Sequence, residues 1–274
     1  MTKPFCFSGD KVIPSSAASL HPLDIGLIRG YAIFDFLRTV NYKPLFLDAY
    51  LDRFITSAES MYLPLSLSRR ELEAVIQQLI ERNDLSQGGL RLVLTGGVSN
   101  NCFSPTKGNL FIFAEELKMP AAEKYENGVK LLSEEYVRPL ASVKSTNYTL
   151  PVWLSAGWQE QAAEDLIYHF NGIISESSRS NIFMVKNGEI ATPKSNILLG
   201  VTRKNVIKLA ETVQERDITL TEILNADEVF MTATTKKILP VTQIDGTLIK
   251  NGRPGPVTLS LLEKFKQLEL QQTS

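Results

Sequence analysis

The sequence is organised around two short stretches, Val143-Lys144-Ser145-Thr146-Asn147-Tyr148 and Ile174-Ser175-Glu176-Ser177-Ser178-Arg179-Ser180-Asn181-Ile182-Phe183, with a predicted helix at 150–163 between them. Lys144 follows an apolar residue, precedes small hydroxyl residues, and has no acidic residue within several positions. Such surroundings favour a partly desolvated lysine, which is a better nucleophile than a solvated one. The alternative is an ordinary surface lysine, because most lysines are solvated.

The second stretch predicts a strand, a sharp polar segment and a hairpin. The polar segment contains Glu176, and the Asn187-Gly188 pair that follows the next strand is typical of a two-residue hairpin turn. Glu176 is a candidate for chemistry, and its alternative is an exposed acid at the end of a strand.

The composition is that of a soluble globular protein. The 274 residues suffice for one large or two ordinary domains, and 43% are hydrophobic and 22% charged. A net charge of −1 favours neither nucleic acid nor an anionic membrane as partner. The cysteines (Cys6, Cys102) and histidines (His21, His169) lack metal-ligand spacing, so we expect no metal. Without a signal pattern or an apolar run of transmembrane length, we expect a cytoplasmic protein.

Capping residues, apolar periodicity and turn residues predict the other helices and strands. The expected elements are a hairpin at Pro4–Pro14, a strand-rich stretch at Gly26–Val40, a strand at Leu45–Leu47, helices at Asp48–Met61 (capped by Asp48), Ser68–Arg82 and Pro256–Gln272, and a helix that opens at Gly200 and runs to Arg216.

Taken in order, these motifs resemble those of the fold type IV (class IV) pyridoxal-phosphate aminotransferases. That family includes branched-chain aminotransferases, D-amino-acid aminotransferases and 4-amino-4-deoxychorismate lyases. The resemblance covers about Gly26 to Thr258 and implies a two-domain α+β or α/β fold, with a small α/β N-terminal domain and a larger C-terminal pseudo-barrel domain. We assign residues 1–118 to the first domain, 119–128 to a linker and 129–274 to the second.

The resemblance implies pyridoxal 5′-phosphate (PLP) as cofactor. Lys144 matches the lysine that holds PLP covalently as an imine and moves the proton between Cα and C4′, and Glu176 matches the carboxylate that pairs with the pyridinium nitrogen. Phosphate ligands are expected at a helix N-terminus and from hydroxyl and guanidinium groups. The remaining cofactor residues that the resemblance implies are Arg53, Tyr148, Ser178, Arg179, Val201, Thr202 and Thr234.

The substrate residues depart from familiar patterns. The loop after the Gly89–Thr95 strand lacks the Arg-x-His pair that D-amino-acid aminotransferases typically contribute from the partner subunit, and Phe34 replaces an expected tyrosine. Phe34-Asp35-Phe36-Leu37-Arg38 partly matches the Phe-Glu-Gly-Ile-Arg sequence of branched-chain enzymes, whereas Asn147 matches the D-amino-acid and lyase branches.

Arg179 stands where small serines are usual in this family. An arginine in a cofactor pocket needs an anion to offset its desolvation, and the phosphate already has Arg53, so we infer a substrate carboxylate. Arg29 and Arg91 are further candidates for that carboxylate, with salt-bridge scaffolding near a dimer interface as the alternative. The expected substrate pocket also includes Phe34 and Thr235.

The combined prediction is an atypical D-amino-acid aminotransferase with branched-chain-like features. It would be a homodimer that moves an amino group between a D-amino acid and a 2-oxo acid (2-oxoglutarate or pyruvate) by a ping-pong mechanism. A branched-chain L-amino-acid aminotransferase is the first alternative, supported by Gly255-Pro256-Val257-Thr258 and the aromatic pair Phe34 and Phe36. A 4-amino-4-deoxychorismate lyase is the second, and a module that binds the cofactor without turnover is the third.

Overall fold

The computed structural model describes residues 2–273, and backbone contacts divide them into two compact units. The N-terminal unit comprises the residues up to Lys118, the segment Val143–Asn147 and the end of the chain from Gln272. The C-terminal unit comprises Met119–Ser142 and Tyr148–Gln271. The segment that carries Lys144 therefore groups with the N-terminal unit. The domain limits expected from the sequence stay predictions, but the expected linker is largely helical, because α4 spans Ala122–Asn127.

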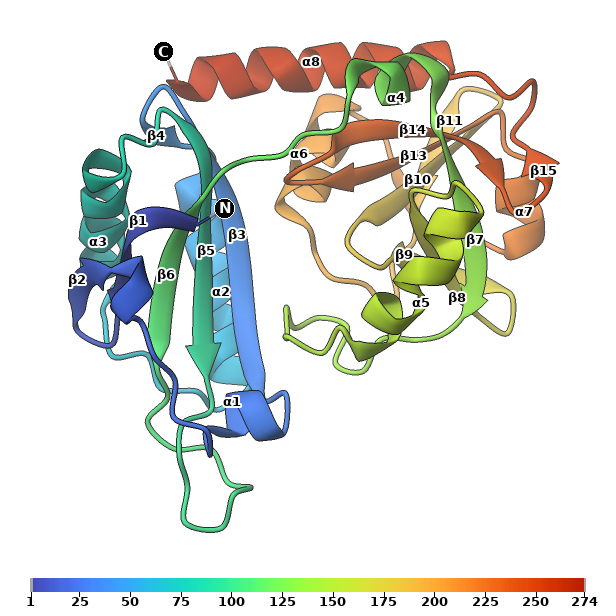
Figure 1. Cartoon of the computed structure of the whole chain (residues 1–274). Helices are drawn as coiled ribbons and strands as arrows, with labels where there is room; N and C mark the ends of the chain where they lie inside the picture. Colours follow the sequence, from blue (N-terminus) through green and yellow to red (C-terminus); the bar gives the residue numbers. More distant parts are fainter. Residues whose placement is uncertain (1, 274) are drawn as a thin grey trace. The chain divides into compact units, whose positions relative to one another are not determined.

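The N-terminal unit is built on a six-stranded sheet in the order β2-β1-β6-β5-β3-β4 (Figure 1). Every pair of neighbouring strands is antiparallel, so this unit is of the α+β type. Helix α2 packs on β3, and α3 packs on β1 and β6. The elements are β1 Thr2–Ser8, β2 Lys11–Pro14, η1 Ser15–Ala17, α1 Ile25–Ile28, β3 Ala32–Val40, β4 Lys43–Pro44, α2 Leu47–Ser60, α3 Arg69–Arg82, β5 Gln87–Thr95 and β6 Leu110–Glu115.

Two local predictions in this unit are confirmed and two are wrong. The hairpin of β1 and β2 turns at Gly9-Asp10, and α3 begins with a capping box between Ser68 and Glu71. The strand expected at Leu45–Leu47 is absent from the described chain, since β4 ends at Pro44 and α2 starts at Leu47. Asp48 does not cap α2: the N-cap is Phe46 in a left-handed conformation, and Asp48 lies in the first turn, where it favours the helix dipole.

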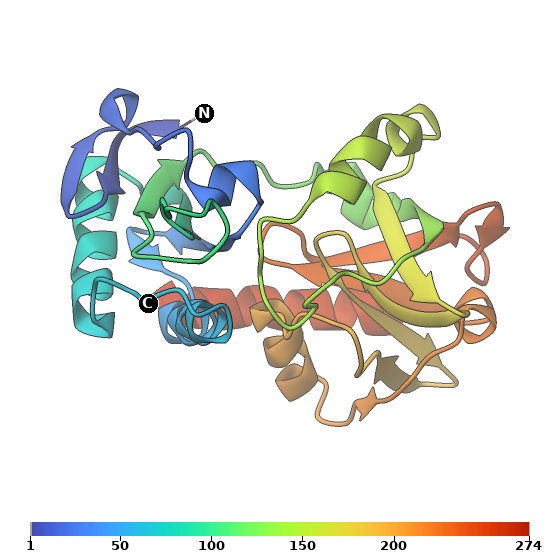
Figure 2. The ribbon, with the colours of Figure 1, turned by 90° about the horizontal axis from the view of Figure 1, so that it is seen from below.

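The loop between β5 and β6 is fixed at its base against α1. Asp24 is fully buried and accepts hydrogen bonds from Thr95 Oγ1 (2.7 Å), Asn109 Nδ2 (3.0 Å) and the Gly26 N–H (2.7 Å). The Ile25 N–H donates to the Gly97 carbonyl over 2.9 Å. Figures 1 and 2 show this loop beside α1. The buried carboxylate thus ties the start of α1 to both ends of the loop.

The C-terminal unit contains a nine-stranded mixed sheet in the order β12-β11-β10-β13-β14-β7-β8-β9, with β15 paired to β14. Its apolar core includes Ile167, Ile182, Met231 and Leu239. The strands are β7 Val129–Glu135, β8 Asp165–Phe170, β9 Ile173–Ser177, β10 Asn181–Lys186, β11 Glu189–Thr192, β12 Gln214–Glu215, β13 Glu228–Ala233, β14 Lys237–Ile244 and β15 Thr247–Leu248. The helices that follow α4 are α5 Thr149–Glu160, α6 Val201–Leu209, α7 Leu220–Leu224 and α8 Pro256–Thr273.

The predicted hairpin at Asn187-Gly188 is confirmed, because Lys186 pairs with Glu189 across it. The helix that opens after Gly200 is shorter than expected. It ends at Leu209 rather than Arg216, because Glu211 has a positive φ of 63° and β12 then pairs with β11. Across residues 2–273, the structure contains no helix with the length and apolar character needed to cross a membrane.

Candidate active site

The backbone of Lys144 is attached to β3. The Phe34 N–H donates to the Lys144 carbonyl over 2.9 Å, and the Thr146 N–H donates to the Ala32 carbonyl over 3.0 Å. Ser145, between them, forms an isolated bridge with Ile33. The short segment therefore lies along β3 like an added strand. Its pairing with the start of β3 fixes the position of the Lys144 backbone, from which the side chain extends.

The Lys144 side chain lies over an aromatic ring. Its Nζ is 4.6 Å from the centre of the Phe34 ring, a distance at which a cation is attracted to the ring face. The Arg91 guanidinium is 5.7 Å from the same ring and 5.0 Å from that of Phe36. Arg91 is itself bonded to Glu115 through two contacts, Nε–Oε1 at 2.5 Å and Nη2–Oε2 at 2.9 Å.

Glu176 lies on β9 and is 4% exposed. Its Oε1 accepts a hydrogen bond from Arg138 Nε (3.0 Å), and its Oε2 accepts one from the Leu198 N–H (2.8 Å). Arg138 is also buried and donates to the Ala141 carbonyl. Arg138 was not found from the sequence; its position between Val137 and Pro139, six residues before Lys144, is the only local signal.

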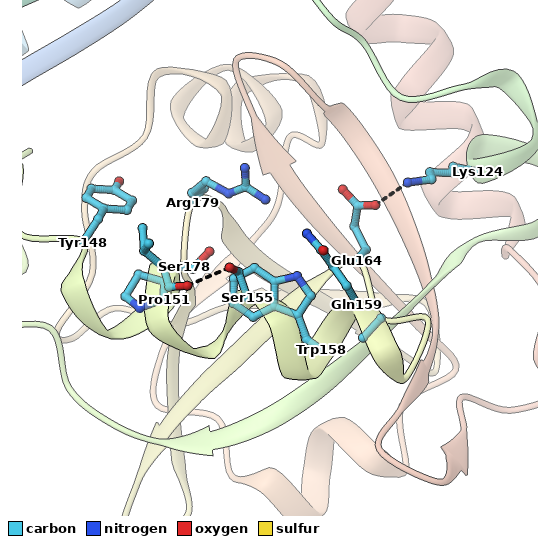
Figure 3. Close-up of a pocket in the computed structure, with 11 residues that line it drawn as sticks. Lys124, Tyr148, Pro151, Ser155, Trp158, Gln159, Glu164, Ser178 and Arg179 are labelled. Atoms are coloured by element: carbon cyan, nitrogen blue, oxygen red, sulfur yellow. Dashed lines mark hydrogen bonds and ion pairs between the residues drawn. The ribbon is translucent and has the colours of Figure 1, made fainter.

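Arg179 follows β9 and projects into a pocket of about 400 Å³ beside α5 (Figure 3). Its side chain is 55% exposed, and its Nη2 is 3.6 Å from Oδ2 of the fully buried Asp165. The desolvation expected of Arg179 is therefore only partial, and a protein carboxylate already faces its guanidinium. The pocket is lined by Lys124, Tyr148, Pro151, Val152, Ser155, Trp158, Gln159, Ala163, Glu164, Ser178 and Arg179.

Asp165 and Lys236 were not found from the sequence either. Lys236 Nζ donates to Asp165 Oδ2 over 2.9 Å, and the Ser178 hydroxyl donates to Asp165 Oδ1. Burial alone would raise the pKa of Asp165, but the charges of Lys236 and Arg179 and the hydrogen bonds from Lys236 and Ser178 outweigh it and hold that pKa below its usual range. The carboxylate is therefore ionised at neutral pH.

Tyr148 is the N-cap residue of α5 and one of the pocket-lining residues. Burial raises the pKa of its phenol, and the negative charges of Glu176 and Asp165 add to this, while Arg138 and Arg179 oppose it. The phenol therefore remains protonated at neutral pH and can donate a hydrogen bond.

The N-terminus of α6 has no side-chain cap. Gly200 is its N-cap residue, Val201 and Thr202 are buried in the first turn, and the first intrahelical bond runs from the Lys204 N–H to the Gly200 carbonyl. A Cβ at position 200 would lie 2.2 Å from Asn181 Oδ1, so glycine permits the close approach of these two segments. The first N–H groups of a helix attract anions, so this terminus suits a phosphate.

The other predicted ligands are distributed over both units. Thr234 and Thr235 lie in the turn between β13 and β14, in the same unit as α6. Arg53 belongs to the N-terminal unit, where its Nε and Nη2 bond both oxygens of Asp35 at 2.8 and 2.6 Å. Arg29 is exposed, and its Nε donates to the Cys102 carbonyl over 3.3 Å.

The family profile described as "Amino-transferase class IV" matches residues 32–244, which is most of the chain. The chain belongs to the class IV aminotransferases. It is accordingly a PLP-dependent enzyme, and the fold type inferred from the sequence motifs is confirmed.

This class IV aminotransferase is similar to relatives with different names. It is 33% identical to a putative branched-chain-amino-acid aminotransferase of Methanocaldococcus jannaschii, over 94% of each chain. It is 30% identical to a D-alanine aminotransferase of Bacillus licheniformis, over 98% of each chain. Among solved structures, the branched-chain amino acid aminotransferase of Escherichia coli has a TM-score of 0.92 at 26% identity, covering 99% of this chain and 96% of that one. These names do not determine which amino acid this enzyme uses as its substrate.

The residues of this class IV aminotransferase fit PLP. The buried Glu176 carboxylate, supported by a guanidinium, suits a protonated ring nitrogen, and the uncapped α6 suits a phosphate. Three buried hydroxyl groups, in β9, in the β9–β10 connection and in β13, have no hydrogen-bond partner within residues 2–273, as expected beside a polar ligand. They belong to Ser177, Ser180 and Thr232.

Proposed function

We propose that this class IV aminotransferase moves an amino group between a D-amino acid and a 2-oxo acid, either 2-oxoglutarate or pyruvate, by a ping-pong mechanism. The observation that carries the proposal is Arg179. Its guanidinium lies in a pocket, and among the described residues it makes an ion pair at 3.6 Å but no hydrogen bond, so its donors remain available for a substrate carboxylate. The D-alanine aminotransferase relatives support the D-configuration.

In this proposal Lys144 is the residue that links covalently to PLP. PLP, when bound, withdraws electrons from the substrate Cα. The Nζ of Lys144, released as a free amine when the substrate amine takes its place on PLP, would accept the proton from Cα and return it to C4′. Such a base works best when it is close and correctly oriented. The attachment of its backbone to β3 supplies that orientation.

Other side chains hold the ring and the phosphate. Glu176 would accept a hydrogen bond from the ring nitrogen and keep it protonated, and the neutral phenol of Tyr148 would donate to the phenolic oxygen of PLP. Ser178, two residues after Glu176, would also contact the cofactor. The phosphate would be held by the N–H groups of Val201 and Thr202 and by the residues Arg53, Thr202 and Thr234.

Arg29 would assist Arg179 in binding the substrate carboxylate, because the described residues leave its terminal amino groups without a hydrogen bond. Arg91 was also a candidate, but its two hydrogen bonds to Glu115 support the structural alternative. If Arg179→Ala and Arg29→Ala each kept the wild-type affinity for 2-oxoglutarate, this carboxylate assignment would be wrong.

A branched-chain L-amino-acid aminotransferase is the second candidate function. Phe34, whose ring lies beside Lys144, and Phe36 are two residues apart on β3 and therefore share one face, which offers an apolar surface for an aliphatic side chain. The Methanocaldococcus jannaschii relative carries that name. Thr235 would contribute to the pocket in either case.

A half-reaction separates these functions. Purified holoenzyme is mixed separately with D-alanine, D-glutamate, L-leucine and L-glutamate while the long-wavelength absorbance of the cofactor is followed. Fast bleaching by the D-amino acids alone supports the proposal, and fast bleaching by L-leucine alone supports the branched-chain enzyme. A spectrum that no amine changes would indicate a binding module, and Lys144→Ala serves as the inactive control.

Oligomeric state is a separate part of the proposal. We infer a homodimer from the resemblance to the family, and sedimentation equilibrium would measure the mass directly. A mass equal to that of one chain at the concentrations used for activity would contradict it.

A further inference from the structure

Asp165 is a buried carboxylate that accepts three hydrogen bonds from neighbouring residues. It begins β8 and is 0% exposed. Its Oδ1 accepts from the Leu166 N–H (2.8 Å) and from the Ser178 hydroxyl, and its Oδ2 accepts from Lys236 Nζ (2.9 Å). Burying an ionised carboxylate is costly unless it is paired and hydrogen-bonded, so these three donors fix its position and charge.

Lys236 is held in turn by two acids. Its side chain is 6% exposed, and its Nζ lies 3.7 Å from Glu164 Oε1 in addition to its bond to Asp165. The other Glu164 oxygen bonds Lys124 over 2.6 Å. Charges of alternating sign therefore run from Lys124 through Glu164, Lys236 and Asp165 to Arg179. Figure 3 shows the Lys124–Glu164 pair and Arg179 beside the same pocket.

Arg179 differs from the other cations of this series. Lys124 and Lys236 each donate a hydrogen bond, whereas the 3.6 Å between Arg179 Nη2 and Asp165 Oδ2 is longer than a hydrogen bond. A carboxylate has about four acceptor positions, and three of those of Asp165 are taken. Asp165 thus attracts the guanidinium by charge while leaving its five N–H donors available.

We propose that Asp165, fixed by Lys236 and Ser178, is a positioning residue that directs Arg179 toward the carboxylate of the 2-oxo acid. The inference rests on the proposed role of Arg179 in substrate binding. A long arginine side chain that is half exposed loses conformational freedom when it binds a ligand, and a fixed charge beside it reduces that loss before the ligand arrives. Asp165 would therefore affect substrate affinity without touching the substrate.

A double-mutant cycle tests this on the holoenzyme. Wild type, Asp165→Asn, Arg179→Ala and the double variant are titrated calorimetrically with glutarate, a dicarboxylate that has no oxo group and cannot react. Asparagine keeps the size of Asp165 and can still accept from Leu166 and Ser178. We expect Asp165→Asn to raise the glutarate Kd about 3- to 10-fold, Arg179→Ala to raise it at least as much, and the double variant to match Arg179→Ala.

The outcomes separate this inference from the function on which it rests. An Asp165→Asn effect of the same size in the Arg179→Ala background would overturn the positioning role. A wild-type Kd for Arg179→Ala would instead overturn the proposed carboxylate site. Steady-state kinetics with 2-oxoglutarate add a second readout, since a positioning role raises KM more than it lowers kcat.

Two further variants distinguish a positioning effect from a general loss of structure. If Asp165→Asn does not fold, Asp165→Asn/Lys236→Met removes both buried charges together and takes its place in the cycle, with the same Kd change expected. Asp227→Asn is the matched control, because Asp227 forms ion pairs with Lys186 and Lys250 in the same unit. It is expected to leave the glutarate Kd unchanged, and an equal rise there would overturn the inference.

Discussion

Arg138 donates a hydrogen bond from Nε to Oε1 of Glu176 over 3.0 Å, and their side chains are only 9% and 6% exposed. The pair joins residues 38 positions apart in the sequence. Because the guanidinium is always charged, it offsets part of the cost of burying the Glu176 carboxylate, the group proposed to face the ring nitrogen.

Removing Arg138 should be strongly destabilising. Arg138→Met removes this cation from beside the buried Glu176 carboxylate, and breaking one side of such a pair typically costs about 3–5 kcal/mol. Urea unfolding of the holoenzyme measures this loss. Arg138→Met/Glu176→Gln should recover part of it, since the uncompensated charge is gone. A single variant within about 1 kcal/mol of wild type would show that the pair is not important for stability.

Gly200→Ala tests the anion site at α6. The added Cβ would lie 2.2 Å from Asn181 Oδ1, so the segment must shift, and we expect a loss of about 1–3 kcal/mol together with weaker PLP retention. Retention is measured by dialysis and absorbance. Gly157→Ala in α5 is the control, because no atom lies within 4 Å of its Cβ; it should gain about 0.5–1 kcal/mol and retain PLP normally.

Arg91→Gln distinguishes a structural arginine from a substrate ligand. The variant breaks the two contacts with Glu115, which are partly exposed, so we expect a loss of only about 1 kcal/mol in unfolding free energy. The affinity for 2-oxoglutarate should change less than about twofold. A tenfold weaker affinity with unchanged stability would instead restore Arg91 as a carboxylate ligand.

Protonation of Asp165 should lower the stability of the folded protein at acidic pH. Its pKa in the folded protein lies below the ordinary 3.8, because Lys236, Arg179 and Ser178 together outweigh the opposing effect of burial. A lowered folded-state pKa gives stability that is present above pH 3.8 and is lost as the pH falls from there toward the folded pKa. Urea unfolding is measured at a series of pH values that decrease from about 5. Below pH 3.8 the urea midpoint should fall less steeply for Asp165→Asn than for wild type. The same flattening in Asp10→Asn, at an exposed turn, would contradict the assignment.

The local elements followed from the sequence because their causes are local. The capping box joins Ser68 to a residue three positions away, and the Asn187-Gly188 turn needs only the conformations of two neighbours. The family and its cofactor were recognised from short motifs around Lys144 and Glu176. Their individual roles, and those of the other site residues, stay predictions.

Only the tertiary structure revealed Arg138 as the partner of Glu176, and Lys236 as the partner of Asp165, which is 71 positions away. Sheet pairing places Asp165 opposite Leu131, and the turn after β13 supplies Lys236, so no local pattern contains the contact. Arg179 illustrates the same limit. Its residue type predicted an anion, but its exposure and the buried carboxylate that faces it depend on how distant strands pack, because burial and charge pairing are properties of the folded chain.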